Sequence, residues 1–200
     1  MPLLFIKELQ AGVRLGLWRM DTDEHTVQSR HPSAVGQLSA LHGVRLEETR
    51  CVYALLHAMT LRSDLFVGHL PSGKPVLDGY QLSISHTKGY VAVILSETQT
   101  VAVDVEYASD RVERVASRFL RSDEHPAGTA GLQVCWSAKE TAYKFYSGQS
   151  LMFGQMRIRP FPSCSCGVVK LENLLQGSVL DIHYECTDEY VLTYAYGNSV

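Results

Sequence analysis

Three runs rich in β-branched and apolar residues follow one another in the middle of the chain and constrain its fold more than any other feature. They cover residues 81–85, 90–96 and 100–106. Only residues 87–89 and 97–99 interrupt them. Closely spaced runs of this kind are typical of an antiparallel meander with short turns. The sequence therefore predicts three consecutive strands in one sheet.

Helical and strand patterns surround this meander. Cys51, Leu55 and Met59 recur at helical spacing and predict a helix over 47–61. Further helices are expected over 33–41, 111–120 and 136–146, further strands over 3–6, 13–18, 156–158, 167–171, 179–185 and 190–196, a turn over 71–75 and a loop over 125–131. This order of strands and helices indicates an α+β fold.

Composition and charge exclude several classes of function. Hydrophobic residues make up 46% and charged residues 20% of the 200, which is typical of a globular protein with a real core. The net charge of −3 gives no general attraction to nucleic acid or to an anionic membrane. No stretch is long and apolar enough for a membrane span, and the first ten residues lack a secretory pattern. With five cysteines, an odd number, we expect reduced thiols and a cytoplasmic location.

Two acidic residues alternate with valines in the third predicted strand. Alternation places Ala102, Asp104 and Glu106 on one face and the valines on the other. Carboxylates at this spacing lie about 7 Å apart at their Cα atoms and could converge on Mg²⁺, which prefers oxygen ligands. The alternative interpretation is a strand whose acidic face is simply solvated.

A second acidic group lies on the predicted helix 136–146. Glu140 and Lys144 are one helical turn apart and lie on one helical face. Such a carboxylate and ammonium could bind a metal or activate a hydroxyl, and they could also stabilise a bound phosphate. The alternative is structural, because Ser137 and Glu140 match a capping box and Glu140 with Lys144 matches a stabilising surface pair. His86 lies just before the predicted turn at 87–89 and could donate a hydrogen bond to a phosphate. Lys74 lies in the rigid turn at 71–75, where its ammonium could hold an anion. Each of the two could equally be an ordinary exposed residue.

Four short motifs occur in the order found in the 4′-phosphopantetheinyl transferases, and the chain resembles the monomeric Sfp-like type of that family. They are Gly73-Lys74-Pro75, Ser85-His86-Thr87, Val103-Asp104-Val105-Glu106, and Trp136-Ser137-Ala138-Lys139-Glu140 with Lys144. The resemblance covers about residues 50–144. It implies transfer of phosphopantetheine from coenzyme A to a serine of an apo acyl or peptidyl carrier protein, with release of 3′,5′-ADP. It also implies an α+β fold of two similar halves with pseudo-twofold symmetry, here 1–96 and 97–200, each a small antiparallel sheet packed with helices, with the active site between them.

The resemblance assigns roles to individual residues. Asp104, Glu106 and Glu140 match the family's Mg²⁺ ligands, Glu140 also matches its proposed general base, and Lys144 matches a lysine that contacts phosphate and aids departure of 3′,5′-ADP. Positions near the cofactor's phosphates are matched by Lys74, Ser85, His86 and Lys139. Arg50 matches an arginine at the 3′-phosphoadenosine end, although upstream of it only Arg30 and Arg45 supply basic charge in that region. Two departures are Ala102, where the family usually has glycine, and a short stretch between Asp104 and Trp136.

Other functions fit parts of the same pattern. A Mg²⁺-dependent phosphoanhydride hydrolase would use the same acids with a water in place of the carrier serine, but the sequence has no Walker loop. A non-catalytic relative that binds coenzyme A or a carrier would not require Glu140 and Lys144 together. A purely structural α+β protein would leave the four ordered motifs to coincidence.

Overall fold

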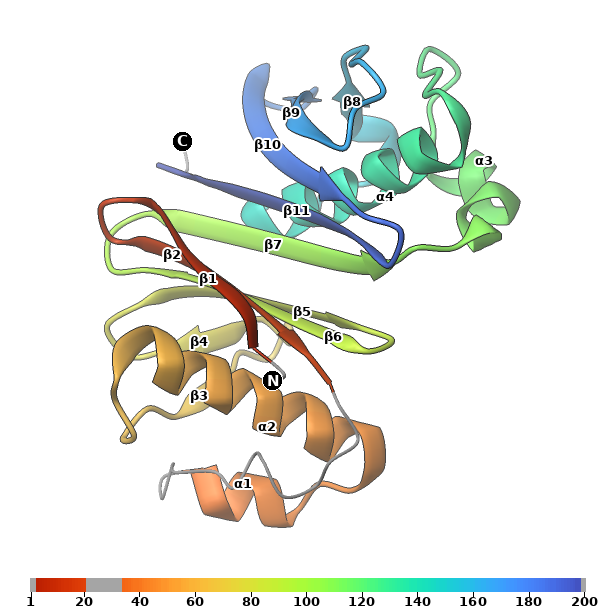
Figure 1. Cartoon of the computed structure of the whole chain (residues 1–200). Coiled ribbons are helices and arrows are strands. Elements are labelled where there is room, and N and C mark those ends of the chain that lie inside the picture. The colour runs from red at the N-terminus through yellow and green to blue at the C-terminus, as the bar shows by residue number, and fades with distance from the viewer. Residues whose placement is uncertain (1–2, 21–33, 199–200) are drawn as a thin grey trace. The chain divides into compact units, whose positions relative to one another are not determined.

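A computed structural model describes residues 3–20 and 34–198, and all structural statements below concern that part of the chain. The chain divides into two compact units, Met1–Val101 and Ala102–Val200. The boundary between them lies slightly later in the sequence than the boundary expected after residue 96. Each unit combines antiparallel strand pairs with helices (Figure 1). The fold is therefore α+β, as the sequence predicts.

The first unit is built on a four-stranded sheet in which β6 and β2 are the inner strands. Its order is β1-β2-β6-β5, and every neighbouring pair is antiparallel. The turn from β1 to β2 contains Gly12 at φ +78°, a left-handed value that favours glycine. The bounds of the strands are β1 (Leu3–Gln10), β2 (Val13–Arg19), β5 (Gln81–Thr87) and β6 (Tyr90–Ser96).

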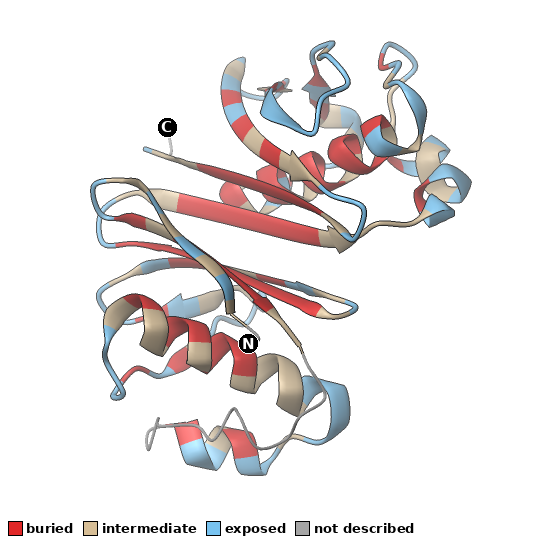
Figure 2. Cartoon of the chain, in the orientation of Figure 1, coloured by how far each residue is buried: buried red, intermediate tan, exposed pale blue. Residues whose placement is uncertain are grey.

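A long helix, α2 (Gly43–Thr60), packs on β2 and β6 of this sheet. Its buried face includes Tyr53, Leu55 and Leu56, and Figure 2 shows buried and intermediate positions alternating along the helix. The predicted helix 47–61 thus begins one turn earlier than expected. The unit is completed by a short helix and a small two-stranded sheet around the predicted turn, namely α1 (Val35–Ser39), β3 (Val67–His69) and β4 (Pro75–Leu77).

The predicted meander is correct for its first two strands and wrong for the third. Strand β7 (Thr100–Tyr107) does not follow β6 in the same sheet; it lies beside β11 (Tyr190–Gly197) in the second unit. The reason lies in strand pairing, because both edges of β6 are already hydrogen-bonded, one to β2 and the other to β5. No edge of β6 remains for a third partner, so β7 must pair elsewhere.

The second unit is a five-stranded sheet of order β7-β11-β10-β9-β8. Helix α4 (Gly128–Phe145) packs on β9, β10 and β11, and its buried face joins a core with Phe119, Met156 and Ile182. The remaining elements are η2 (Asp110–Val115), α3 (Ala116–Phe119), η3 (Phe153–Gln155), β8 (Met156–Ile158), β9 (Cys166–Asn173) and β10 (Ser178–Cys186).

Two predictions about the helices of this unit need correction. The helix expected over 111–120 is a 3₁₀ segment followed by a single α-helical turn. The loop expected over 125–131 already contains the start of α4, which begins at Gly128 rather than at Trp136. Glycine at 128 and 131 suggested a loop, but Gly131 lies in the first turn of the helix, where a Cβ would come within 3.2 Å of Pro126 Cβ. Among the described residues, no helix is long and apolar enough to cross a membrane.

Close contact between β2 and α2 gives a stability prediction. A Cβ at Gly16 would lie 2.8 Å from Leu55 Cδ2 and 3.1 Å from Met59 Sδ, both in the buried core of the first unit. Gly16→Ala is therefore expected to lower the free energy of unfolding by about 1–3 kcal/mol through overpacking. Gly36→Ala is the matched control, because nothing lies within 4 Å of its Cβ position in α1 and alanine favours a helix. Denaturant unfolding that gives equal stabilities for the two variants would contradict this packing.

Candidate active site

Asp104 of β7 is buried and fully engaged by side chains of α4. Its carboxylate is 4% exposed, which excludes the interpretation of a solvated strand face at this position. Lys144 Nζ donates to Asp104 Oδ1 at 2.9 Å, and Ser137 Oγ donates to Asp104 Oδ2 at 2.8 Å. Lys144 also donates to the carbonyl of Val103 at 2.9 Å. Strand β7 and helix α4 are therefore joined through one buried acid.

The capping-box alternative for the helix motif does not hold, and Lys144 does more than pair with Glu140 along α4. Ser137 lies in the interior of α4 and cannot cap a helix that begins at Gly128. Its hydroxyl lies 2.8 Å from Thr193 Oγ1, which in turn lies 2.6 Å from Thr141 Oγ1, so a buried chain of hydroxyls backs the Asp104 contact. Lys144 of α4 forms an ion pair with Asp104 of β7. A surface pair between Glu140 and Lys144 along α4 would not provide this contact between helix and strand.

Glu106 and Glu140 extend this acidic group. Trp136 Nε1 donates to Glu106 Oε1 at 2.7 Å, so α4 contacts both acids of β7. Burial raises the pKa of Glu140, repulsion from Asp104 and Glu106 raises it further, and Lys144 opposes the shift. A raised pKa makes Glu140 a stronger base than an ordinary carboxylate. We call Asp104, Glu106, Glu140 and Lys144 the carboxylate cluster.

The cluster has the donor types that Mg²⁺ prefers, but its side chains are not arranged as a finished metal site. Within residues 3–20 and 34–198, no three His, Cys, Asp or Glu side chains form a group that could hold a metal ion. Positive charge at Asp104 is instead supplied by the Lys144 ammonium. The mutual repulsion that acts on Glu140 is nevertheless the condition under which a divalent cation would be bound favourably.

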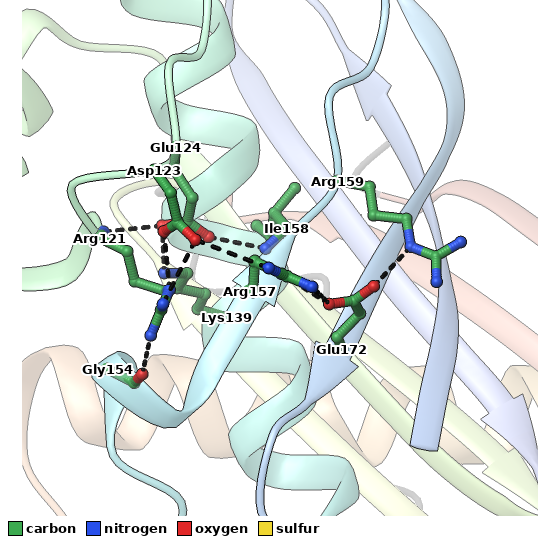
Figure 3. A network of polar contacts seen from close by, with 9 residues as sticks. All are labelled: Arg121, Asp123, Glu124, Lys139, Gly154, Arg157, Ile158, Arg159 and Glu172. Atoms are coloured by element: carbon green, nitrogen blue, oxygen red, sulfur yellow. Dashed lines mark hydrogen bonds and ion pairs between the residues drawn. The ribbon is translucent and has the colours of Figure 1, made fainter. Parts of the chain in front are cut away.

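Lys139 has a different environment from its neighbours in the motif. It is 0% exposed, and its ammonium donates to Glu124 Oε2 at 2.6 Å (Figure 3). The same ammonium donates to the Phe119 carbonyl at 2.8 Å. Burial lowers its pKa, and the Glu124 carboxylate opposes that shift. The structure thus places Lys139 inside the second unit as part of a buried ion pair, where its ammonium does not present itself to a cofactor phosphate.

The first unit contains a cavity of about 490 Å³ that collects residues of two motifs. His86 lines it, as do Gly73 and Pro75 on either side of Lys74. Its other lining residues come largely from α2 and the β3–β4 region, namely Gln37, Leu41, Arg45, Glu48, Thr49, Val52, Tyr53, Val67, His69 and Ile84. His86 Nδ1 lies 3.1 Å from Glu48 Oε1, so this nitrogen carries a proton and the carboxylate fixes the ring's orientation.

Two other predicted residues of the first unit lie away from the cavity lining. Ser85 is 7% exposed and alternates with the cavity-lining Ile84 and His86 along β5, so it points to the opposite face. Arg50 is half-buried in α2 and is not among the lining residues, whereas Arg45 is. Helical spacing would have identified Arg45, because residues 45, 48, 49 and 52 share one face once the helix is known to begin at Gly43. Arg30 lies outside the described residues.

A cavity of about 400 Å³ lies beside Glu106 in the second unit. Apolar walls from Val112, Val115, Trp136 and Phe153 combine with two exposed arginines, Arg111 and Arg118. Arg111, Val115 and Arg118 have the spacing of one helical face, a signal that sequence reasoning did not use. The cavity offers a mainly apolar surface that leads to a carboxylate of the cluster.

No protein-family model matches the chain, and no curated protein matches it. The site is therefore argued from its geometry.

Loss of the Lys144 ammonium is expected to destabilise the second unit. Lys144→Met leaves the buried Asp104 carboxylate with Ser137 but without its ion pair, so the free energy of unfolding should fall by about 1–3 kcal/mol. Lys170→Met removes the same charge from an ion pair whose side chains are 51% and 55% exposed, and should cost about 0–1 kcal/mol. Chemical denaturation of both variants measures the difference, and equal losses would show that Asp104 does not depend on Lys144.

Proposed function

We propose that this chain transfers 4′-phosphopantetheine from coenzyme A to a serine of an apo acyl or peptidyl carrier protein, with Mg²⁺, and releases 3′,5′-ADP. The observation that carries the proposal is the carboxylate cluster. Residues of two motifs more than 30 positions apart, Asp104 with Glu106 and Glu140 with Lys144, gather around contacts between β7 and α4. A structural role alone would not require Glu140 to lie where the Asp104 and Glu106 carboxylates repel its charge.

The cavity of the first unit supports coenzyme A as the co-substrate. Arg45, His69 and His86 provide cationic or hydrogen-bonding groups, and Gly73 and Pro75, the neighbours of Lys74 in sequence, also line the cavity. Such groups suit the phosphates of a nucleotide-like molecule, because charge-assisted hydrogen bonds to phosphate oxygens are the strong ones. In this proposal the two units are the related halves of the family fold, each with an 18-residue helix packed on its sheet.

The chemistry follows from the residues of the cluster. The carrier serine oxygen attacks the β-phosphorus of coenzyme A, the new P–O bond forms, and the bond to the α-phosphate oxygen breaks. Glu140 accepts the serine proton, and Lys144 stabilises negative charge that develops on the departing 3′,5′-ADP. A Mg²⁺ ion held by Asp104, Glu106 and Glu140 would supply further positive charge to the diphosphate. The apolar cavity beside Glu106 would receive the pantetheine arm and exclude water from it.

Intact mass of a carrier protein tests the proposal directly. Apo carrier incubated with this chain, coenzyme A and Mg²⁺ should gain about 340 Da, the mass of one phosphopantetheine group, and EDTA should prevent the gain. Several unrelated apo carriers that stay unmodified would contradict it. Coenzyme A consumed without a carrier would then identify a hydrolase, and coenzyme A bound without turnover would identify a binding protein.

Replacement of the proposed base tests its role separately. Glu140→Gln keeps the size of the half-buried side chain but cannot accept the serine proton, so the transfer rate should fall by about 10²–10⁴-fold while the fold persists. Glu97→Gln makes the same change at an exposed position in the turn after β6 and should leave the rate unchanged. A Glu140→Gln variant that transfers at the full rate would remove Glu140 from the mechanism.

A further inference from the structure

The buried pair of Lys139 and Glu124 is the most completely bonded polar group of the second unit. Glu124 Oε1 accepts from the Ile158 amide at 2.6 Å, and Glu124 Oε2 accepts from the Arg121 amide at 2.9 Å and from Lys139 Nζ at 2.6 Å (Figure 3). Lys139 also donates to the Phe119 carbonyl at 2.8 Å. The pair thus joins α4 to the end of α3, to the segment that follows it, and to β8.

The inner ion pair of this network, Lys139 with Glu124, is more tightly constrained than the outer ion pairs. The side chains of Lys139 and Glu124 are 0% and 2% exposed, so neither charge can turn toward water without a large loss. The outer ion pairs of the same region, Arg121 with Asp123 and Arg157 with Glu172, each have at least one exposed partner and contribute less. The inner pair therefore determines how α4 lies against its neighbours on this side.

The geometry connects this pair to the carboxylate cluster in two ways. Lys139 and Glu140 are consecutive on α4 and thus about 100° apart around its axis, so a fixed direction for one fixes the direction of the other. Through Phe119 there is also a path of contacts. The Phe119 carbonyl accepts from Lys139, its ring packs edge-on against Trp136 at 5.3 Å, and Trp136 donates to Glu106.

We propose that Lys139 is a positioning residue: its buried ion pair with Glu124 fixes the rotation of α4 about its axis and so holds Glu140 and Trp136 at the carboxylate cluster. This inference rests on the proposed function for the role of Glu140, although its effect on Trp136 does not. An apolar pair could fill the same space, but it would leave the Arg121 and Ile158 amides without their Glu124 acceptor. The charged pair additionally constrains orientation, because four hydrogen bonds define where the Lys139 ammonium and the Glu124 carboxylate must lie.

The test replaces the pair by apolar residues, Lys139→Met with Glu124→Leu. We expect a folded variant, a displaced indole N–H signal of Trp136 in a ¹⁵N–¹H spectrum, and a kcat for carrier modification lowered about 10²-fold. KM for coenzyme A should stay within about threefold, because the cavity of the first unit is untouched. The chain has two tryptophans, so Trp18 of the first unit serves as the unmoved internal reference, and Trp136→Phe assigns the signal.

A matched control makes the same changes at the exposed pair of β9 and β10, Lys170→Met with Asp181→Leu, and should alter neither the indole signal nor kcat. A folded Lys139→Met/Glu124→Leu variant with the wild-type kcat overturns the proposal. If that variant does not fold, Lys139→Met alone takes its place, because Glu124 keeps its two backbone donors. If the wild-type chain modifies no carrier, the proposed function is wrong, and the Trp136 signal of the variant tests the positioning role by itself. An unmoved signal then overturns that role, and a displaced signal supports it.

Discussion

The buried carboxylate of Asp104 is the constraint on which the second unit depends. A charge with this little access to water is tolerated only where partners replace the lost hydration. Here those partners, Lys144 and Ser137, both come from α4, so the acid ties these two positions of the helix to β7. The strand and helix periodicities then place Glu106 on the same strand face as Asp104 and Glu140 one helical turn from Lys144.

The two units carry different chemistry. Acidic side chains and their lysine gather in the second unit, whereas the first presents a cavity with imidazole and guanidinium groups at its wall. Within the cavity, the carboxylate of Glu48 is the exception, and its contact with His86 gives that imidazole a defined orientation.

Sequence reasoning was reliable where local periodicity determines the outcome. Alternation along 101–106 and the helical spacing of Glu140 and Lys144 placed these residues on common faces, and the order of the four motifs then selected them as a candidate site. Sequence reasoning failed where residues far away in the sequence determine the burial of a side chain or the partner of a strand. Burial of Lys139 depends on Glu124 and on the backbone of Ile158. The placement of β7 depends on β2, which already occupies the edge of β6 that the meander would have used. Arg50 was selected by its match to the family, whereas the cavity of the first unit is lined by Arg45 of α2.

The position of β11 has a consequence for how the chain is made. In the first unit, every strand of the main sheet has been synthesised once residue 96 is complete. In the second unit, the strand that separates β7 from β10 is the last one in the chain, Tyr190–Gly197. On the ribosome, β7 must therefore wait for nearly the whole of the second unit before it gains its neighbour, whereas the first sheet can form during synthesis. Strand β7, which carries Asp104 and Glu106, is consequently secured late in the synthesis of the second unit.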